Sequence, residues 1–280
     1  MLKKIKTIFY TTRWGEWSLI SLIISVISGI IIGLHYQVET PLYSSTTLEL
    51  LIPFGAYFRS LHFYSSQFFF LFSILHLVAI FDQTESYSQG RWIQYTLSLI
   101  VSLLLLFSGY VLRGDTTGSS AGMIAENILL SLPIVGDTLN SLLFSVTENG
   151  MSRVYLNHVI GFDFVWIFLL WNHLRRYRIT PSSNLFVTSA ILLSGLLLTA
   201  PLEIAHPGMF HITGPWFFVG LQELLKYLPV LVAGVLIPAL FLLALFCLRK
   251  NKTCFPQFLI FISIWLIAYL VLTVVGFQSV

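Results

Sequence analysis

Residues 62–81 read HFYSSQFFFLFSILHLVAIF and residues 158–174 read HVIGFDFVWIFLLWNHL, so each of these two apolar stretches carries two histidines. The four histidines are His62, His76, His158 and His173. Fourteen residues separate the first pair and fifteen separate the second. In an α-helix these intervals rise about 21 and 22 Å and return the second side chain to within about 60° of the first. The pattern predicts two membrane helices that present histidines at two matching depths.

The composition is typical of a polytopic membrane protein, because 56% of the residues are hydrophobic and only 10% are charged. Apolar runs predict seven spans, at 17–36, 62–81, 93–112, 158–174, 184–201, 228–248 and 256–275. The alternation expected of a membrane β-barrel is absent, so we predict an all-α membrane protein. The basic cluster near residue 178 predicts a division into a four-helix part, residues 1–180, and a three-helix part, residues 181–280.

The basic residues predict the orientation of the chain in the membrane. With the N-terminus in the cytoplasm, eleven lysines and arginines fall on the cytoplasmic side and four fall outside. The four are Arg59, Arg113, Arg153 and Lys226. Cytoplasmic loops carry an excess of Lys and Arg, so we expect a cytoplasmic N-terminus. This topology accounts for the net charge of +3, and no nucleic-acid partner is expected.

The four histidines are candidate axial ligands for two haems. Neutral imidazole binds haem iron, and two histidines per iron leave no open position, which favours electron transfer over oxygen chemistry. Because both helices are expected to run inward, His62 pairs by depth with His158 near the outer side, and His76 with His173 near the inner side. A hydrogen-bonded packing role remains the alternative for any single membrane histidine.

Glycines and arginines are placed where haems would need them. Gly15 and Gly29 lie fourteen residues apart on the first span, and Gly109 lies near the end of the third. Glycine lets a backbone come close to a flat group, although helix packing would also use it. Arg59 and Arg153 precede the outer histidines, where a guanidinium could bind haem propionates or simply extend to the membrane surface.

The longer predicted outer connections are candidates for the functional face. They cover 37–61, 113–157 and 202–227, and the second contains an amphipathic stretch at Ala121–Leu132. The third is unusually polar, with Glu203, His206, Pro207, His211, Pro215 and Trp216. Loops held by a rigid bundle often carry function, so we expect it on this side.

Five motifs along nearly the whole chain resemble cytochrome b of bc-type quinol-oxidising complexes. They are Gly29–Tyr36, Arg59–His62, Ser108–Leu112, Leu132–Gly136 and Arg153–His158. The fifteen-residue interval is similar to that of the plastid-type and Gram-positive branch. The three-helix C-terminal part resembles that branch's separate smaller subunit, fused here, and the chain as a whole resembles a menaquinol-type bacterial variant.

The resemblance implies a specific cofactor set and reaction. Such a protein binds two b haems, each by two histidines, and oxidises quinol, here menaquinol, at an outer pocket. One electron passes to a Rieske or other iron–sulfur protein or a c-type cytochrome, and the other crosses through the haems to an inner quinone site. The resemblance further implies an enzyme subunit of the quinol–cytochrome c reductase type, in a homodimeric complex of the bacterial inner membrane.

Three departures from the family pattern affect the expected site. The family's P-E-W-Y reads Gly214–Phe217, its L-P-W-G reads Leu112–Asp115, and the glycine expected fourteen residues before Gly109 is Tyr95. The expected quinol pocket therefore contains Pro215, Trp216 and Phe217 but lacks the family's proton-accepting glutamate. Quinol oxidation releases protons, so another acid or base is needed. The candidates are Glu223 and Glu126, with His211 behind them.

Two other functions are also compatible with these patterns. The chain could be a di-haem membrane anchor that links the quinone pool to another periplasmic oxidoreductase, such as a hydrogenase. It could also be a transporter or channel with histidines in a proton relay, although a relay needs neither pairing by depth nor glycines. The quinone type, redox potentials and electron-accepting partner are not determined by the sequence patterns.

Overall fold

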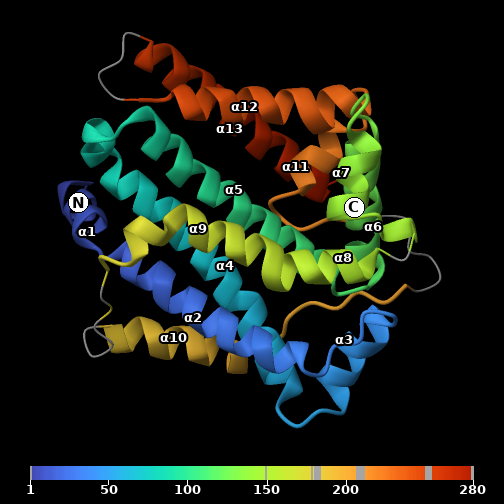
Figure 1. Cartoon of the computed structure of the whole chain (residues 1–280). Helices are drawn as coiled ribbons and strands as arrows, with labels where there is room; N and C mark the ends of the chain where they lie inside the picture. Colours follow the sequence, from blue (N-terminus) through green and yellow to red (C-terminus); the bar gives the residue numbers. More distant parts are fainter. Residues whose placement is uncertain are drawn as a thin grey trace. The chain divides into compact units, whose positions relative to one another are not determined.

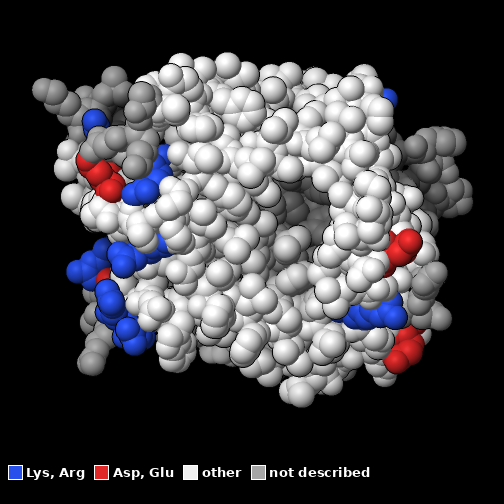
Figure 2. Space-filling view, turned by 45° about the horizontal axis from the view of Figure 1, so that its top comes forward, with Lys and Arg blue, Asp and Glu red and all other residues white. Residues whose placement is uncertain are grey.

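The computed structural model describes residues 2–148, 150–177, 179, 184–205, 212–249 and 254–278. Within these residues every regular element is a helix (Figure 1), which confirms the predicted all-α class. Most of the face seen in Figure 2 carries no Lys, Arg, Asp or Glu, as expected of a protein surrounded by lipid.

Five of the described helical segments are long and apolar enough to cross a membrane. They are Trp14–Gly33 (α2), Gly55–Ser86 (α4 with η1), Gln89–Val111 (α5), Met151–Leu174 (α8 to α9) and Phe255–Gln278 (α13). Two shorter apolar helices, Leu185–Leu197 (α10) and Val232–Cys247 (η5 with α12), lie at the fifth and sixth predicted spans. The 13 residues of α10 rise only about 20 Å, because the backbone becomes extended at Leu198 ahead of Pro201.

The first compact unit contains residues 1–106 and 164–201. Here α2 packs along α4 (Gly55–Ile80), and α10 packs against both. Leu61 is buried in the core between these helices, and Gly195 of α10 meets it closely, since a Cβ at Gly195 would lie 2.8 Å from the Leu61 Cβ. Small residues at such crossings let membrane helices pack closely. Two short helices, α1 (Leu2–Thr11) and α3 (Pro41–Leu50), also contact α4.

The second compact unit contains residues 107–163 and 202–280. The short helix α11 (Val219–Leu224) and the helix α12 (Ile237–Cys247) both pack on α13. A second pair, α6 (Thr116–Leu130) and α7 (Gly136–Leu143), forms a helical hairpin in the predicted 113–157 connection. The predicted division into residues 1–180 and 181–280 is a division along the sequence, and it stays a prediction.

Candidate functional site

His76 and His173 lie together in the first unit, on α4 and α9 (Phe162–Leu174). Their ring centroids are 6.2 Å apart. Two imidazoles on opposite sides of one metal ion, each with a nitrogen–metal distance of about 2 Å, would place their ring centres about 6 Å apart. The Nε2 atom of His76 is buried and has no hydrogen-bond partner among the described residues. The pair therefore has the spacing of two axial ligands and an unused ligand nitrogen.

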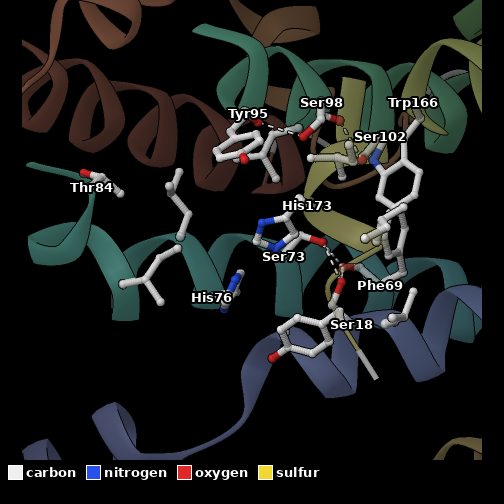
Figure 3. A pocket seen from close by; sticks show the side chains of 18 of the residues that line it. Ser18, Phe69, Ser73, His76, Thr84, Tyr95, Ser98, Ser102, Trp166 and His173 are labelled. Carbon is white, nitrogen blue, oxygen red and sulfur yellow. Dashed lines mark hydrogen bonds between the residues drawn. The ribbon is translucent and has the colours of Figure 1, made fainter. Parts of the chain in front are cut away.

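A cavity surrounds this histidine pair (Figure 3), and both side chains line it. It contains about 830 Å³ of space not filled by atoms, counting the part open to solvent. Cofactor sites are commonly apolar clefts with a few placed polar groups. The polar groups here include Ser18, whose hydroxyl lies 2.7 Å from that of Ser73. The mainly apolar lining and the two imidazoles suit a haem b.

His62, the other histidine of α4, is oriented by the backbone of α2. Its Nδ1 donates a hydrogen bond of 2.8 Å to the carbonyl of Ser25. Donation from Nδ1 places the lone pair of the neutral ring on Nε2, the nitrogen that a metal would use. A backbone acceptor of this kind is typical of the groups that orient histidine ligands.

Each of the three predicted glycines lies against a histidine ring. A Cβ added at Gly15 would lie 3.0 Å from Cε1 of His76, and one added at Gly29 would lie 2.8 Å from Cε1 of His62. In the second unit, a Cβ at Gly109 would lie 2.9 Å from Cε1 of His158. A larger residue at any of these positions would have to displace the histidine ring, so each predicted glycine is a close neighbour of one of the histidines. Their role in making room for haems stays a prediction.

His173 has an aromatic neighbour in place of a glycine. The ring of Tyr95 meets it edge-on with centroids 5.4 Å apart, and Tyr177 stacks against it at 6.1 Å. Both tyrosines line the cavity. Burial and the Glu16 carboxylate raise the pKa of Tyr177, so its hydroxyl keeps its proton at neutral pH. Tyr95, which occupies a position where the family pattern has a glycine, is thus in direct contact with His173.

His158 lies in the second unit, within a π-helical turn at Asn157–Gly161 (η3). Its Nδ1 is 3.0 Å from the hydroxyl of Ser108 on α5. The π turn was not predicted, although the interval of fifteen residues instead of fourteen was its signal in the sequence. His62 and His158 belong to different compact units, and their pairing by depth stays a prediction.

The two candidate propionate ligands have different surroundings. Arg59 is buried, and it donates from Nε to Glu49 at 2.7 Å and from Nη2 to the carbonyl of Ala200 at 2.6 Å. These bonds tie α4 to α3 and to the segment after α10. Arg153 is exposed on the short helix α8 (Met151–Leu156). Propionate binding by either arginine stays a prediction, and for Arg59 it would have to share the guanidinium with these partners.

Glu126 is buried inside the α6–α7 hairpin and has three local donors. Its carboxylate accepts from Asn140 Nδ2 at 2.9 Å, from the Thr147 amide at 3.1 Å and from the Thr147 hydroxyl at 2.9 Å. A carboxylate bonded in this way joins α6 to α7 and to the turn that follows. Its proposed part in proton transfer is not required to explain its burial.

Glu223, on α11, is also buried but has partners that reach solvent. Lys226 Nζ lies 2.6 Å from one carboxylate oxygen, and the Tyr227 hydroxyl donates to the other at 2.8 Å. The side chain of Lys226 is 42% exposed and Tyr227 is 66% exposed, whereas Glu223 is 2% exposed. The arrangement connects a buried carboxylate to two groups that can exchange protons with water.

The stretch Gly214–Phe217 forms a turn just before α11. Pro215 is buried, Trp216 is 44% exposed, and the Phe217 carbonyl accepts a bond of 2.7 Å from the Tyr269 hydroxyl of α13. Gln222 holds the turn from the other side, because its side chain accepts from the Gly214 amide at 2.8 Å and donates to the Ile212 carbonyl at 2.6 Å. The candidates His206, Pro207 and His211 lie outside the described residues.

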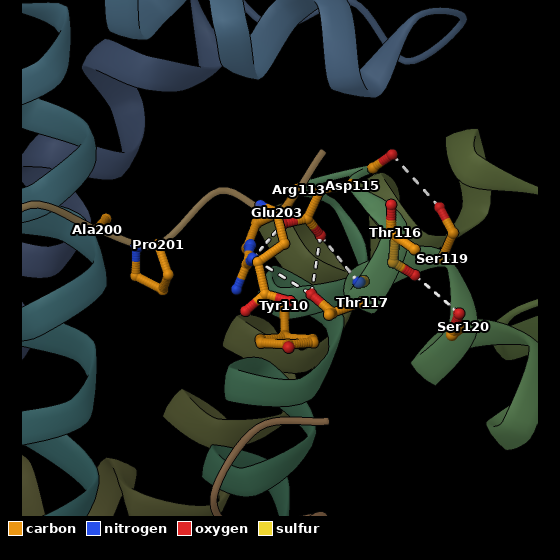
Figure 4. Close-up of polar contacts among 12 residues, drawn as sticks. Tyr110, Arg113, Asp115, Thr116, Thr117, Ser119, Ser120, Ala200, Pro201 and Glu203 are labelled. Atoms are coloured by element: carbon orange, nitrogen blue, oxygen red, sulfur yellow. Dashed lines mark hydrogen bonds and ion pairs between the residues drawn. The ribbon is translucent and has the colours of Figure 1, made fainter. Parts of the chain in front are cut away.

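The altered stretch Leu112–Asp115 forms a buried polar cluster (Figure 4). Arg113 makes an ion pair with Asp115 and lies over the ring of Tyr110, 4.5 Å from its centroid. Asp115 caps α6 by accepting from the Gly118 amide at 2.9 Å, and it accepts from the Glu203 amide at 2.8 Å. Sequence reasoning missed this cluster, because its last partner is 88 residues away.

The chain is similar in sequence to known cytochromes b. The family model described as cytochrome b (N-terminal)/b6/petB matches residues 67–185. Cytochrome b6 of Heliomicrobium gestii is 29% identical over 179 residues, which cover 61% of this chain and 83% of that protein. Cytochrome b of Dictyostelium citrinum is 23% identical over 269 residues, or 82% of this chain and 69% of that protein.

A solved structure shares the fold over most of the chain. It is titled hyperthermophilic respiratory Complex III, and it matches with a TM-score of 0.68 and 21% sequence identity. The match covers 94% of this chain and 82% of that one. The family model and the relatives confirm the predicted resemblance to cytochrome b, and the solved structure shows that the fold is shared.

Proposed function

We propose that the chain is the di-haem cytochrome b subunit of a bacterial bc-type respiratory complex that oxidises menaquinol. The observation that carries the proposal is the His76–His173 pair, 6.2 Å apart in an apolar cavity, with the buried Nε2 of His76 unpaired among the described residues. Haem b, when bound, supplies one-electron transfer at the iron. His76 and His173 would hold the iron through their ring nitrogens, and the apolar lining of the cavity would exclude water.

The four histidines divide between two haem sites in this proposal. His76 and His173 hold the inner haem, and His62 and His158 hold the outer one. The Ser25 carbonyl and the Ser108 hydroxyl, each on Nδ1 of an outer ligand, orient those two rings. Two ligands per iron leave no site for oxygen, so the histidines favour electron transfer through the membrane.

The outer quinol pocket is proposed at Pro215, Trp216 and Phe217, with Glu223 as the proton acceptor. Glu223 is preferred to Glu126 because its partners Lys226 and Tyr227 are exposed and titratable, so they can pass a proton to water. The partners of Glu126, Asn140 and Thr147, carry no titratable group. The three hydrogen bonds that the Glu126 carboxylate accepts must be broken or rearranged before the carboxylate can take up a proton.

The assembly follows the same reasoning. The uneven basic residues support a bacterial inner-membrane protein with a cytoplasmic N-terminus. The electron acceptor is proposed to be a Rieske or other iron–sulfur protein, or a c-type cytochrome, on the outer side of a homodimeric complex.

The proposal is tested by a reduced-minus-oxidised spectrum and a haem assay on the purified complex. Two b haems per chain are expected, and a preparation without a b-type band would overturn the proposal. Glu223→Gln is expected to lower quinol turnover at least tenfold and to change its pH profile. Intact turnover and an intact pH profile in a Glu223→Gln, Glu126→Gln double variant would exclude both carboxylates.

One observation favours a second candidate, a di-haem anchor for another periplasmic oxidoreductase such as a hydrogenase. The buried Arg113–Asp115 pair and the Gly214–Phe217 turn lie in the two stretches of the chain that depart most from the family pattern. The subunits that co-purify with the chain decide between the two: an iron–sulfur or c-type partner supports the first candidate, and a catalytic oxidoreductase subunit supports the second.

A further inference from the structure

The two histidine pairs are spaced differently along their helices. The interval in α4 is fourteen residues of regular α-helix, whereas the interval from His158 to His173 is fifteen residues in the continuous helix Met151–Leu174. At about 100° per residue, fourteen residues end about 40° short of whole turns and fifteen end about 60° beyond them. An all-α helix would therefore offset the second pair by about 100° relative to the first.

The π turn at Asn157–Gly161 removes this offset. A π turn closes i→i+5 hydrogen bonds and so takes one additional residue into a single turn of an otherwise α-helical segment. Fifteen residues that include one π turn consequently return the side chain to nearly the same face as fourteen residues of α-helix. His158 itself lies within the turn, beside Asn157.

Asn157 holds the turn to a neighbouring helix end. Its Nδ2 donates to the carbonyl of Leu142 at 2.9 Å and to that of Leu143 at 3.3 Å. These are the last two residues of α7, and helix ends leave their final carbonyls without intrahelical donors. The amide thus satisfies two backbone acceptors while it fixes the first residue of the π turn.

Gly161, the last residue of the turn, makes room for this amide. A Cβ at Gly161 would lie 2.8 Å from Oδ1 of Asn157, closer than real Cβ contacts. The amide cannot swing away without losing its bonds to α7. Asn157 and Gly161 are therefore matched: one is held from outside the helix and the other leaves space for it.

We propose that Asn157 and Gly161 are positioning residues that maintain the π turn, and that the turn takes up the additional residue between the haem ligands His158 and His173. This inference rests on the proposed function, since it concerns how the ligands are presented to haem. Neither residue contacts iron; each acts through the backbone that carries His158.

The test compares single-residue deletions in the two histidine helices. Deletion of Ile160 leaves fourteen residues between the ligands, and it is expected to convert the turn to α-helix with both haems retained. The matched control is deletion of Leu71, an exposed residue of α4, which has no π turn to absorb the change. That deletion is expected to remove at least one haem.

Asn157→Ala provides a second measurement, which would not change if Asn157 only stabilised the fold. The redox midpoint and electron paramagnetic resonance signal of the haem bound by His158 are expected to shift, while the haem bound by His76 and His173 reports that the chain has folded. Combining Asn157→Ala with deletion of Ile160 is expected to restore the shifted signals, because the shortened helix no longer needs the turn.

The outcomes separate the inference from the function on which it rests. If the protein without any substitution binds no haem, both the proposed function and the positioning role are wrong. A second outcome is that the protein without substitutions binds two haems, but deletion of Ile160 removes as much haem as deletion of Leu71. This outcome overturns the positioning role and leaves the proposed function intact. Unaltered haem signals in Asn157→Ala would also overturn it.

Discussion

The two histidine helices present similar ligands by different local means. In α4, a regular α-helix, both His62 and His76 lie against a glycine of α2. In the helix Met151–Leu174, His158 lies in a π turn and His173 lies against two tyrosines. A nearly symmetric pattern in the sequence thus corresponds to two unequal halves in the structure. Histidines with similar spacing thus have different neighbours on the two helices. The neighbours of metal ligands affect the redox potential and the metal affinity of a site.

The largest expected effect comes from removing a ligand on the regular helix. His76→Leu is expected to abolish binding of the inner haem and to halve the haem content per chain, because one imidazole cannot replace the bis-histidine pair. The pyridine haemochrome assay on purified protein measures this directly. His35→Leu is the matched control, since His35 is exposed and bonds only locally, to the Ile31 carbonyl at 3.1 Å. Equal haem contents in the two variants would contradict the assignment.

The next effect tests the glycine contacts of α2. Gly29→Val places a side chain where a Cβ would already lie 2.8 Å from the ring of His62. Overpacking of this kind costs about 1–3 kcal/mol, so lower thermal stability and loss of the haem bound by His62 are expected. Gly90→Val is the control, because a Cβ there meets nothing within 4 Å. If Gly29→Val and Gly90→Val had the same haem content and the same thermal stability, the close contact between Gly29 and His62 would have no effect on haem binding.

A smaller effect distinguishes how the two outer ligands are oriented. Ser108→Ala removes a hydroxyl 3.0 Å from Nδ1 of His158, whereas Ser25→Ala keeps the backbone carbonyl that accepts from His62. Groups behind a metal ligand typically contribute about 10–100-fold in affinity, so we expect haem affinity to fall about tenfold in Ser108→Ala and little in Ser25→Ala. Haem-transfer kinetics to apomyoglobin compare the variants. The reverse order would show that the hydroxyl does not orient His158.

The smallest expected effect concerns the tyrosine beside His173. Tyr95→Gly restores the glycine of the family pattern and admits water, which favours the more charged oxidised haem. The potential of the inner haem is expected to fall by about 30–60 mV, at most a tenfold change for one electron. Tyr95→Phe keeps the ring and should leave the potential near that of the unchanged chain. A rise in potential for Tyr95→Gly would disprove this account of the tyrosine.

Much of the fold followed from local signals. Long apolar runs predicted helices at 17–36, 93–112 and 256–275, and the structure has spanning helices at each place. The fifth predicted span extended to 201, but α10 ends at Leu197, since its last predicted turn leads into the extended segment before Pro201. The glycines were grouped with the histidines because both recur with the helical period, which brings them to one face.

Contacts between distant segments were beyond the sequence patterns. From its place near His62, Arg59 was a candidate to bind propionates or to extend to the membrane surface. Its acceptors at Ala200 and Pro201 are more than 140 residues away in the sequence. Arg113 and Asp115 were interpreted as altered family positions, and their link to Glu203 depends on where the chain returns. Glu223 and Glu126 were both candidates for the proton acceptor, and their different hydrogen-bond partners are visible only in the structure.

The amino-acid sequence by itself determined the membrane class, the helical architecture and the four candidate haem ligands with their three glycines. Hydrophobicity and helical period act over one or two turns, so they can be read from neighbouring residues. Only the tertiary structure decided that the turn carrying His158 is bonded to the end of α7, that His173 meets Tyr95, and that the buried Glu223 is bonded to two exposed, titratable side chains. These features depend on packing between helices and on where long-range backbone acceptors lie, which no local pattern encodes.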